Sequence, residues 1–251
     1  MNIKELDYER PIKISKFDFS CDDIDKSIPK PLPQNQNFFK LIIGRPGSGK
    51  SNLILNLLCK KNKNYNNKFD KVFIFSPSMA TIKNNPFESI PEDQMFEELT
   101  VEILEGVLDM IRDTGDKILL IMDDTVNDIK RSTELQRLIS KIVMNRRHLA
   151  GAGGSVALIM TSQVYNKIPA PIRKTASHLY IFHTRNKKEL DTIFDELILI
   201  SKKEFYKILN FVFKKRHDFL YIDTNAPLNK MFHKNFKLLN FKMDGDDELN
   251  V

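Results

Sequence analysis

Eight consecutive residues, GRPGSGKS at 44–51, have the spacing of a loop that binds a polyphosphate. They match the pattern GxxxxGK[ST], with the apolar segment FFKLII before them and an amphipathic segment after them. Glycines let such a loop turn sharply and aim backbone N–H groups at a phosphate, and the positive end of the following helix adds to the attraction. We expect Lys50 to contact the β- and γ-phosphates of ATP and Ser51 to bind Mg²⁺. The expected nucleotide contacts are Gly44, Arg45, Pro46, Gly47, Ser48, Gly49, Lys50, Ser51 and Asn52.

A second segment, KILLIMDD, places two carboxylates directly after an apolar run. Residues 118–122 predict a buried strand, and ligands bind at the carboxyl ends of strands in parallel α/β sheets. We expect Asp123 to hold Mg²⁺ through water. Asp124 projects differently, because successive strand residues alternate in direction, and it is the candidate general base for the attacking water. An ordinary Asp-Asp turn that closes a strand is the alternative, which the upstream loop disfavours.

The next apolar run, SVALIM at 155–160, leads into the polar residues Thr161, Ser162 and Gln163. If this strand lies between the strand before the loop and the strand before the Asp pair, these polar groups reach the same sheet edge. Gln163 is then positioned to hydrogen-bond the γ-phosphate or the water and to report hydrolysis as motion. A strand that simply ends in turn residues is the alternative.

Three arginines are candidates for neutralising the negative charge that develops during phosphoryl transfer. Arg146 and Arg147 stand in NRRHLAGAGG, before a Gly-rich turn, and Arg173 stands in PAPIRK. We expect one of them to reach the nucleotide of a neighbouring subunit, and we prefer Arg147. The alternative for each is a cation at a helix C-terminus or a solvated loop charge.

The elements that must position these groups follow from the alternation of apolar runs with amphipathic segments. Short β-branched or aromatic runs predict strands at 38–43, 71–75, 117–122, 155–160, 178–182 and 219–222. Apolar residues at helical spacing predict helices at 50–59, 94–112, 133–149, 187–199 and 202–213. We therefore predict an α/β fold, with a mostly parallel sheet and helices on both faces.

Composition excludes several classes of protein. The chain has 251 residues, 41% of them hydrophobic and 29% charged, which excludes disorder throughout. Its two cysteines, Cys21 and Cys59, form no CxxC pair, so we expect a reducing compartment rather than a disulfide scaffold or a zinc site. The sequence has no run of 18 apolar residues and no signal-peptide pattern, so we expect a soluble protein without a membrane span.

Charge is segregated along the chain, although the net charge is only +6. Residues 84–111 hold eight acidic side chains and no basic one, whereas residues 167–188 hold six basic side chains and no acidic one. A further basic segment, 202–216, contains aromatics whose spacing favours helix core over base stacking. We expect the basic surface to bind double-stranded DNA without reading its sequence. The acidic segment is either a contact between subunits or a solvated helix face.

We divide the chain into three parts. Residues 1–37 form a Pro-interrupted N-terminal arm, residues 38–225 form the nucleotide-binding domain, and residues 226–251 form a C-terminal extension. The extension ends in the acidic tail DGDDELN, which we expect to be solvated.

The order and spacing of seven segments between residues 38 and 197 resemble a known family. The segments are GRPGSGKSNLI, KVFIFSPS, KILLIMDD, NRRH, LIMTSQ, IPAPIRK and ASHLYIFHTRNKKEL. They resemble the poxvirus-type genome-packaging ATPases of large DNA viruses and virophages, within the FtsK/HerA superfamily of P-loop ATPases. The resemblance implies a RecA/FtsK-like P-loop core, with an additional strand between the strand before the loop and the strand before the Asp pair.

The resemblance also implies a function. It implies a homo-oligomeric ring that hydrolyses ATP with Mg²⁺ and drives double-stranded DNA into a capsid, with a capsid or portal protein as partner. Such a protein would act in the virion or in a viral factory of the host cytoplasm. On matching positions the resemblance assigns Lys50 and Ser51 to nucleotide and Mg²⁺, Asp123 and Asp124 to metal and base, Gln163 to sensing, and Arg147 or Arg173 to the neighbour's site.

Two other functions share a loop of this kind. A nucleoside or nucleotide kinase would need an acceptor pocket and an Arg-rich lid, and it needs no strand between the loop strand and the metal-side strand. An interaction protein gated by nucleotide would bind ATP with negligible turnover. One departure from the family bears on the assignment: many relatives have Asp-Glu where this chain has Asp-Asp, which shortens the reach of Asp124.

Overall fold

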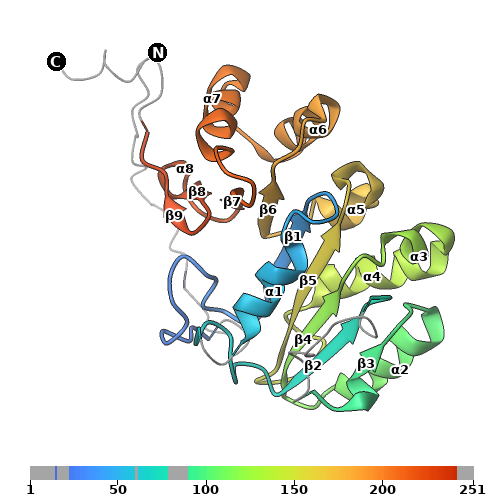
Figure 1. Cartoon of the computed structure of the whole chain (residues 1–251). Helices are drawn as coiled ribbons and strands as arrows, with labels where there is room; N and C mark the ends of the chain where they lie inside the picture. The colour runs from blue at the N-terminus through green and yellow to red at the C-terminus, as the bar shows by residue number, and fades with distance from the viewer. Residues whose placement is uncertain (1–14, 16–22, 60–61, 79–89, 242–251) are drawn as a thin grey trace, which may run out of the picture.

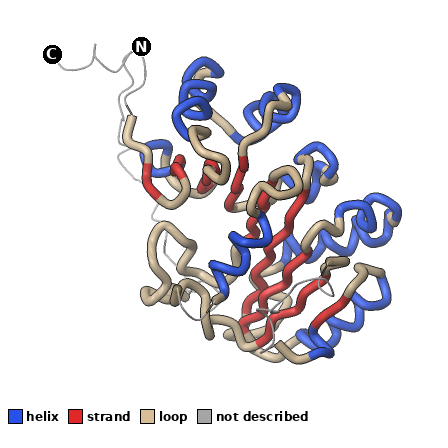
Figure 2. Tube along the Cα trace, viewed as in Figure 1, coloured by secondary structure: helices blue, strands red, loops and turns tan. Residues whose placement is uncertain are grey.

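A computed structural model describes residues 15, 23–59, 62–78 and 90–241 of the chain (Figures 1 and 2). Most of the N-terminal arm, Glu88 of the acidic segment and the acidic tail lie outside the described residues. Within the described part, no helix has the length and apolar composition needed to cross a membrane.

A single nine-stranded sheet organises the molecule, in the order β3-β2-β4-β5-β1-β6-β7-β8-β9 (Figure 1). The six strands from β3 to β6 in this order are mutually parallel, and β7, β8 and β9 join as antiparallel neighbours. The predicted mostly parallel α/β sheet is therefore confirmed. The strands are β1 Phe39–Ile43, β2 Lys71–Phe75, β3 Met95–Phe96, β4 Lys117–Met122, β5 Ser155–Ser162, β6 His178–Phe182, β7 Phe219–Asp223, β8 Phe232–Lys234 and β9 Lys237–Leu238.

Helices cover both faces of the sheet because each central strand is apolar on both sides. One face packs against α1 and the segment around Ile28 and Leu32, and the other packs against α2 to α7. Neighbouring strand residues divide between the two cores, as Leu120 and Ile121 do. The helices are α1 Lys50–Leu58, α2 Val101–Ile111, α3 Val126–Arg131, α4 Thr133–Asn145, α5 Ala170–Arg173, α6 Lys187–Leu197, α7 Lys202–Val212 and α8 Leu228–Met231, with 3₁₀ turns η3 Glu92–Gln94 and η4 Tyr165–Lys167.

The helix predicted at 94–112 is wrong in its first part. Residues 95–96 form β3, a short parallel strand beside β2, and the rings of Phe75 and Phe96 stack at 5.2 Å. The helix begins only at Val101, where the Thr100 hydroxyl accepts a hydrogen bond from the Ile103 amide as an N-cap. The predicted helix at 133–149 is also too long, since α4 ends at Asn145.

The sheet continues beyond residue 226. Residues 232–234 pair with β7 as β8, and the Phe232 side chain is fully buried in the core. The β8–β9 hairpin therefore belongs to the same sheet as β1, the strand that leads into the loop at 44–51.

Candidate functional site

The polar groups singled out in the sequence meet at one edge of the sheet. Strand β5 lies directly between β1 and β4, so the extra strand is where the resemblance placed it. Ile43 at the end of β1 pairs with Ser162, and the Gly44 amide donates to the Ser162 carbonyl at 3.0 Å. Because all three strands are parallel, the loop after β1 and the polar residues after β4 and β5 share the carboxyl edge.

The loop at 44–51 has the backbone that a phosphate cradle needs. Gly47 and Gly49 adopt positive φ angles of 71° and 113°, which side chains other than glycine rarely tolerate. At Gly44 a Cβ atom would stand 2.4 Å from Oγ of Ser48 and 2.8 Å from Cβ of Phe182. Gly49 is also the N-cap of α1, so the positive end of that helix faces the same concavity.

Lys50 lies across the mouth of this cradle. Its Nζ donates to the Gly44 carbonyl at 2.8 Å, and a second carbonyl, that of Arg45, lies 3.5 Å away. Desolvation lowers the pKa of Lys50, while the nearby carboxylates of Asp124 and Asp123 oppose this shift. The ammonium group is therefore held at the loop by hydrogen bonds to backbone carbonyls and by attraction to the carboxylates of Asp123 and Asp124. From this position it can contact a phosphate bound in the loop.

Asp123 is held in place by two hydroxyl groups. The Thr161 hydroxyl donates to its Oδ1 at 2.7 Å, and the Ser76 hydroxyl after β2 lies 3.4 Å from its Oδ2. The Thr161 hydroxyl also accepts a hydrogen bond from the Asp124 amide at 2.9 Å. Sequence reasoning brought Thr161 to this edge without a role and overlooked Ser76, which follows a predicted strand in the same way as the Asp pair.

Asp124 and Gln163 contact one another. The Gln163 amide nitrogen donates to Oδ2 of Asp124 at 2.9 Å, and both side chains are exposed. Asp124 has a φ of 57°, so the chain turns sharply there and its carboxylate separates from that of Asp123.

These residues fit a magnesium nucleotide. Mg²⁺ in phosphoryl-transfer sites is bound by one or two protein oxygens, with the remaining ligands from phosphates and water. Ser51 is exposed in the first turn of α1, and Asp123 is partly exposed at the same edge. Within the described residues, no group of three or more His, Cys, Asp and Glu side chains is close enough to hold a metal ion alone. Ser51 and Asp123 are thus the residues that would hold the ion together with the nucleotide.

Arg173 and Arg146 each donate hydrogen bonds within the chain. Nε and Nη2 of Arg173 donate to the two carboxylate oxygens of Glu196, at 2.9 and 2.5 Å, and Nη1 donates to the Ile168 carbonyl. The Arg146 guanidinium donates to the Asn37 carbonyl at 2.6 Å and to the Val143 carbonyl. Their contacts favour structural roles: Arg173 joins α5 to α6, and Arg146 joins α4 to the start of β1.

Arg147 is exposed at the opposite edge of the sheet from the loop. The carbonyl of the preceding residue, Arg146, accepts from the Val156 amide at the start of β5, whereas Gly44 contacts the end of β5. Arg147 therefore lies at the amino edge of the sheet, too far along β5 to serve the nucleotide loop of its own chain.

His217 contacts the loop and was not predicted from the sequence. Its Nδ1 donates to the Ser48 carbonyl at 2.9 Å, although the two residues are 169 positions apart. Strand β7 is antiparallel to β6, with Phe219 opposite Phe182, so the loop before β7 returns to the carboxyl edge. The basic run KKRH at 214–217 was visible in the sequence, but the strand direction that brings it here was not.

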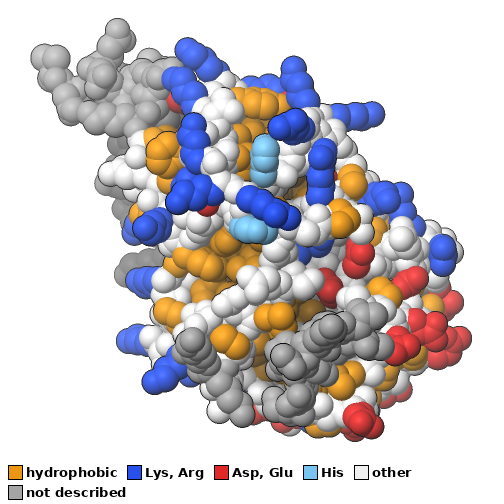
Figure 3. Space-filling view, in the orientation of Figure 1, with side chains coloured by type: hydrophobic (Ala, Val, Ile, Leu, Met, Phe, Trp, Pro, Cys, Tyr) orange, Lys and Arg blue, Asp and Glu red, His pale blue; other side chains and the backbone are white. Residues whose placement is uncertain are grey.

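A basic surface adjoins the same edge. Lys and Arg side chains gather over α6, α7 and the loops beside them, while acidic side chains gather on the other side of the same face (Figure 3). The loop after β6 and the loop before β7 both contribute, because these strands are antiparallel neighbours. The exposed residues of this surface are His183, Arg185, Lys187, Lys188, Lys214, Lys215, Arg216 and His217.

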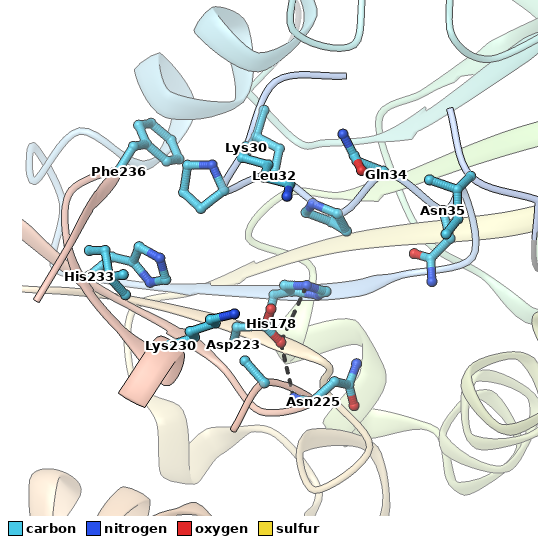
Figure 4. A pocket seen from close by; sticks show the side chains of 15 residues that line it. Lys30, Leu32, Gln34, Asn35, His178, Asp223, Asn225, Lys230, His233 and Phe236 are labelled. Carbon is cyan, nitrogen blue, oxygen red and sulfur yellow. Dashed lines mark hydrogen bonds and ion pairs between the residues drawn. The ribbon is translucent and has the colours of Figure 1, made fainter. Parts of the chain in front are cut away.

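A cavity of about 660 Å³ lies at the end of β6 and β7 that is remote from the loop at 44–51 (Figure 4). There Nε2 of His178 stands 3.8 Å from Oδ1 of Asp223, which also accepts from the Asn225 amide at 3.0 Å. Burial lowers the pKa of His178 and raises that of Asp223, so the pair is less charged than it would be in water. His178 pairs with the start of β1, so this cavity is remote from the end of that strand, where the nucleotide loop begins.

The sequence model of the Poxvirus A32 protein family matches residues 32–225. The chain belongs to this family. The family expected from the motif order is thus confirmed, and as a member of it the chain is an ATP-hydrolysing P-loop enzyme. No curated protein matches the sequence.

Solved structures share the fold of this A32-family chain. The DNA-packaging ATPase B204 from Sulfolobus turreted icosahedral virus is 19% identical, covers 81% of this chain and 98% of its own, and has a TM-score of 0.56. The genome-packaging NTPase B204 from Sulfolobus turreted icosahedral virus 2, in complex with ATP-gammaS, is 16% identical. The match covers 82% of this chain and 100% of the B204 chain, with a TM-score of 0.54. EssC (ATPases 2 and 3) from Geobacillus thermodenitrificans is 13% identical. The match covers 83% of this chain and 41% of the EssC chain, with a TM-score of 0.52.

Proposed function

We propose that the chain is an ATP-driven translocase that packages double-stranded viral DNA into a capsid. The observation that carries the proposal is the meeting of the loop at 44–51, Asp123, Asp124 and Gln163 at one sheet edge, beside an exposed basic surface. The groups at the sheet edge suit hydrolysis of a nucleoside triphosphate, and the basic surface suits binding of a polyanion. Membership in the A32 family and the shared fold with viral packaging ATPases support the same function.

Each residue of the site has a proposed role in hydrolysis. The backbone N–H groups of 44–51 and the Lys50 ammonium bind the phosphates of ATP. Ser51 and Asp123 would hold Mg²⁺, which would supply positive charge to neutralise the phosphates. Asp124 accepts the proton of the attacking water, and Gln163, which contacts Asp124 at 2.9 Å, exchanges that contact for the γ-phosphate or the water.

The arginine that completes the site is proposed to come from a neighbouring subunit. Arg147 stands at the amino edge of the sheet, and the nucleotide loop stands at the carboxyl edge. A homo-oligomer in which the amino edge of one subunit meets the carboxyl edge of the next would bring the two together. Head-to-tail contacts of this kind close into rings when the rotation allows it.

The basic surface is proposed to contact DNA. The cations between residues 183 and 188 and between 214 and 217 are exposed, and they lie on the loop after β6, at the start of α6 and on the loop before β7. His217 joins this surface to the Ser48 carbonyl, and through this hydrogen bond a change in the loop at 44–51 on hydrolysis would reach the basic surface. Phosphate contacts of this kind carry no sequence information, so a capsid or portal partner, or location at the site of virion assembly, would select the viral genome.

The decisive experiment measures ATP turnover with and without long double-stranded DNA. We expect DNA to stimulate turnover at low salt and the stimulation to fall as salt rises. The double variant Lys215→Gln/Arg216→Gln should weaken DNA binding. The slope of the logarithm of the binding constant against the logarithm of the salt concentration should become smaller in magnitude by about 2. Lys130→Gln/Arg131→Gln, which removes two exposed cations at the end of α3, is the matched control. Equal turnover with and without DNA contradicts a translocase, and phosphate transfer to nucleosides would indicate a kinase instead.

A further inference from the structure

A cavity of about 500 Å³ opens beside the phosphate-binding loop. Two of its wall residues, Gly49 and Asn52, belong to that loop and to the first turn of α1. Its other walls come from the exposed side of α1, the segment after α1, the end of β6, the start of β7, and the turn between β8 and β9. The wall residues that matter here are Asn52, Asn56, Phe182, His217, Phe219 and Phe236.

The cavity is continuous with the phosphate cradle at Gly49. A Cβ atom at this position would stand 3.3 Å from the Phe182 ring and 3.5 Å from Nδ1 of His217. His217 is itself fixed to the Ser48 carbonyl of the loop. The ribose and base of a nucleotide whose phosphates lie in the cradle must extend beyond the loop, and this cavity opens directly beside Gly49 and Asn52.

A row of aromatic rings forms the floor of the cavity. The rings of Phe182 and Phe219 are 5.3 Å apart, and those of Phe219 and Phe236 are 5.4 Å apart. Phe182 and Phe219 are buried, whereas Phe236 remains 37% exposed. A partly exposed ring that packed neighbours hold in place is suited to stacking with a nucleobase.

Carboxamides provide the polar part of the wall. The Asn56 amide donates to the Asn52 carbonyl at 2.7 Å, and the Asn62 amide donates to Oδ1 of Asn56 at 2.8 Å, so this wall is held together by its own bonds. The Asn52 side chain is exposed at the cavity. A carboxamide can donate to N7 and accept from the N6 amine of adenine. Among the described residues, no Lys, Arg, Asp or Glu lines the cavity, so it suits a neutral aromatic group rather than a phosphate.

We propose that this cavity holds the purine base of the nucleotide, with Phe236 as the stacking ring and the Asn52 amide as a hydrogen-bonding partner. The inference rests on the proposed function, because it takes the triphosphate to lie in the loop at 44–51. It assigns a binding role to the β8–β9 hairpin, which carries none of the catalytic groups.

The test compares two ligands that share phosphates but differ in the base. Calorimetry measures binding of ATPγS and of inorganic tripolyphosphate, each with Mg²⁺ and without DNA. We expect Phe236→Leu to weaken ATPγS binding about tenfold, because stacking on an aromatic ring is lost, and to leave tripolyphosphate binding unchanged. Phe236→Tyr should keep wild-type affinity for both. Phe211→Leu, which replaces a 58% exposed phenylalanine of α7, is the control and should change neither affinity.

Three results would overturn the base site. They are an equal loss of affinity for both ligands in Phe236→Leu, unchanged ATPγS binding in that variant, and wild-type protein that binds tripolyphosphate or a pyrimidine triphosphate as tightly as ATPγS. Wild-type protein that binds none of these ligands contradicts the proposed function instead. Because the measurement involves neither DNA nor turnover, a failure of DNA stimulation leaves the base site standing.

Discussion

The Gln163 side-chain amide donates a 2.9 Å hydrogen bond to Oδ2 of Asp124, across the ends of β5 and β4. Two residues earlier on β5, the Thr161 hydroxyl donates to Asp123. The two adjacent carboxylates are thus held by different partners: Asp123 by two hydroxyl groups at the partly buried strand end, and Asp124 by one exposed amide. A carboxylate with a fixed orientation suits a metal ligand, whereas one with a single exchangeable contact suits proton transfer.

Asp124→Asn is therefore expected to separate binding from hydrolysis. The variant keeps the shape of the side chain but cannot accept a proton, so single-turnover hydrolysis should fall by roughly 10²–10⁴ while ATPγS affinity stays within a factor of two or so. Asp109→Asn, at an exposed site on α2, is the control. Hydrolysis at the wild-type rate in Asp124→Asn would remove this residue from the role of base.

Thr161→Val is expected to loosen the metal site without unfolding the protein. Valine has nearly the same shape, but it removes the donor to Asp123 and the acceptor for the Asp124 amide. Loss of a group that orients a metal ligand costs about 10–100-fold in metal affinity or activity. We expect a rise of this size in the Mg²⁺ concentration needed for half-maximal turnover. Thr175→Val, which removes a hydroxyl that donates to the nearby Ile172 carbonyl, should leave the Mg²⁺ requirement unchanged.

The central strands and the catalytic edge were predictable because their signals are local. Strands β2, β4 and β6 are continuous apolar runs, and their observed bounds are the predicted ones. The polar residues that follow β4 and β5 meet because parallel strands end at one edge, and the motif order indicated which strands are neighbours.

What the sequence did not reveal depends on contacts between distant segments. Residues 95–96 read as the start of a helix because their pairing with β2 is a tertiary interaction, which overrides local propensity. The contact of His217 with Ser48 requires knowing that β7 runs antiparallel to β6. Arg173 was a candidate for the neighbour's site because nothing in its own segment points to Glu196, which lies 23 residues away.

Arg173→Gln is expected to lower stability rather than to remove a group from the neighbour's site. The ion pair with Glu196 is bidentate, and only 13% and 12% of the two side chains is exposed. Its loss should reduce the free energy of unfolding by about 2–3 kcal/mol in urea titrations at pH 7. Arg112→Gln breaks an ion pair with Asp109 that is mostly exposed, and it should cost under about 1 kcal/mol.

The same ion pair predicts a dependence of stability on pH. The hydrogen bond from Arg173 holds the pKa of Glu196 below its ordinary value of 4.5. The native state therefore binds fewer protons than the unfolded state, so this stabilisation is present above pH 4.5 and is lost as the pH falls further. Urea titrations at pH 7 and at pH 3.5 measure the free energy of unfolding at each pH. Between the two pH values this free energy should fall less for Arg173→Gln than for the wild type. Parallel losses in both proteins would mean that other carboxylates dominate.

Arg147 is expected to act between subunits, because it lies at the sheet edge opposite its own nucleotide loop. Arg147→Ala and Lys50→Ala proteins should each lack turnover. In a random 1:1 mixture, about one quarter of sites pair an intact Lys50 with an intact Arg147 from the neighbour, since each condition is met half of the time. Mixing should therefore restore measurable hydrolysis, whereas Arg137→Ala, which changes an exposed arginine of α4, should need no rescue. No recovery with Arg147→Ala, together with recovery with Arg173→Ala, would transfer the role to Arg173 and require its pair with Glu196 to open.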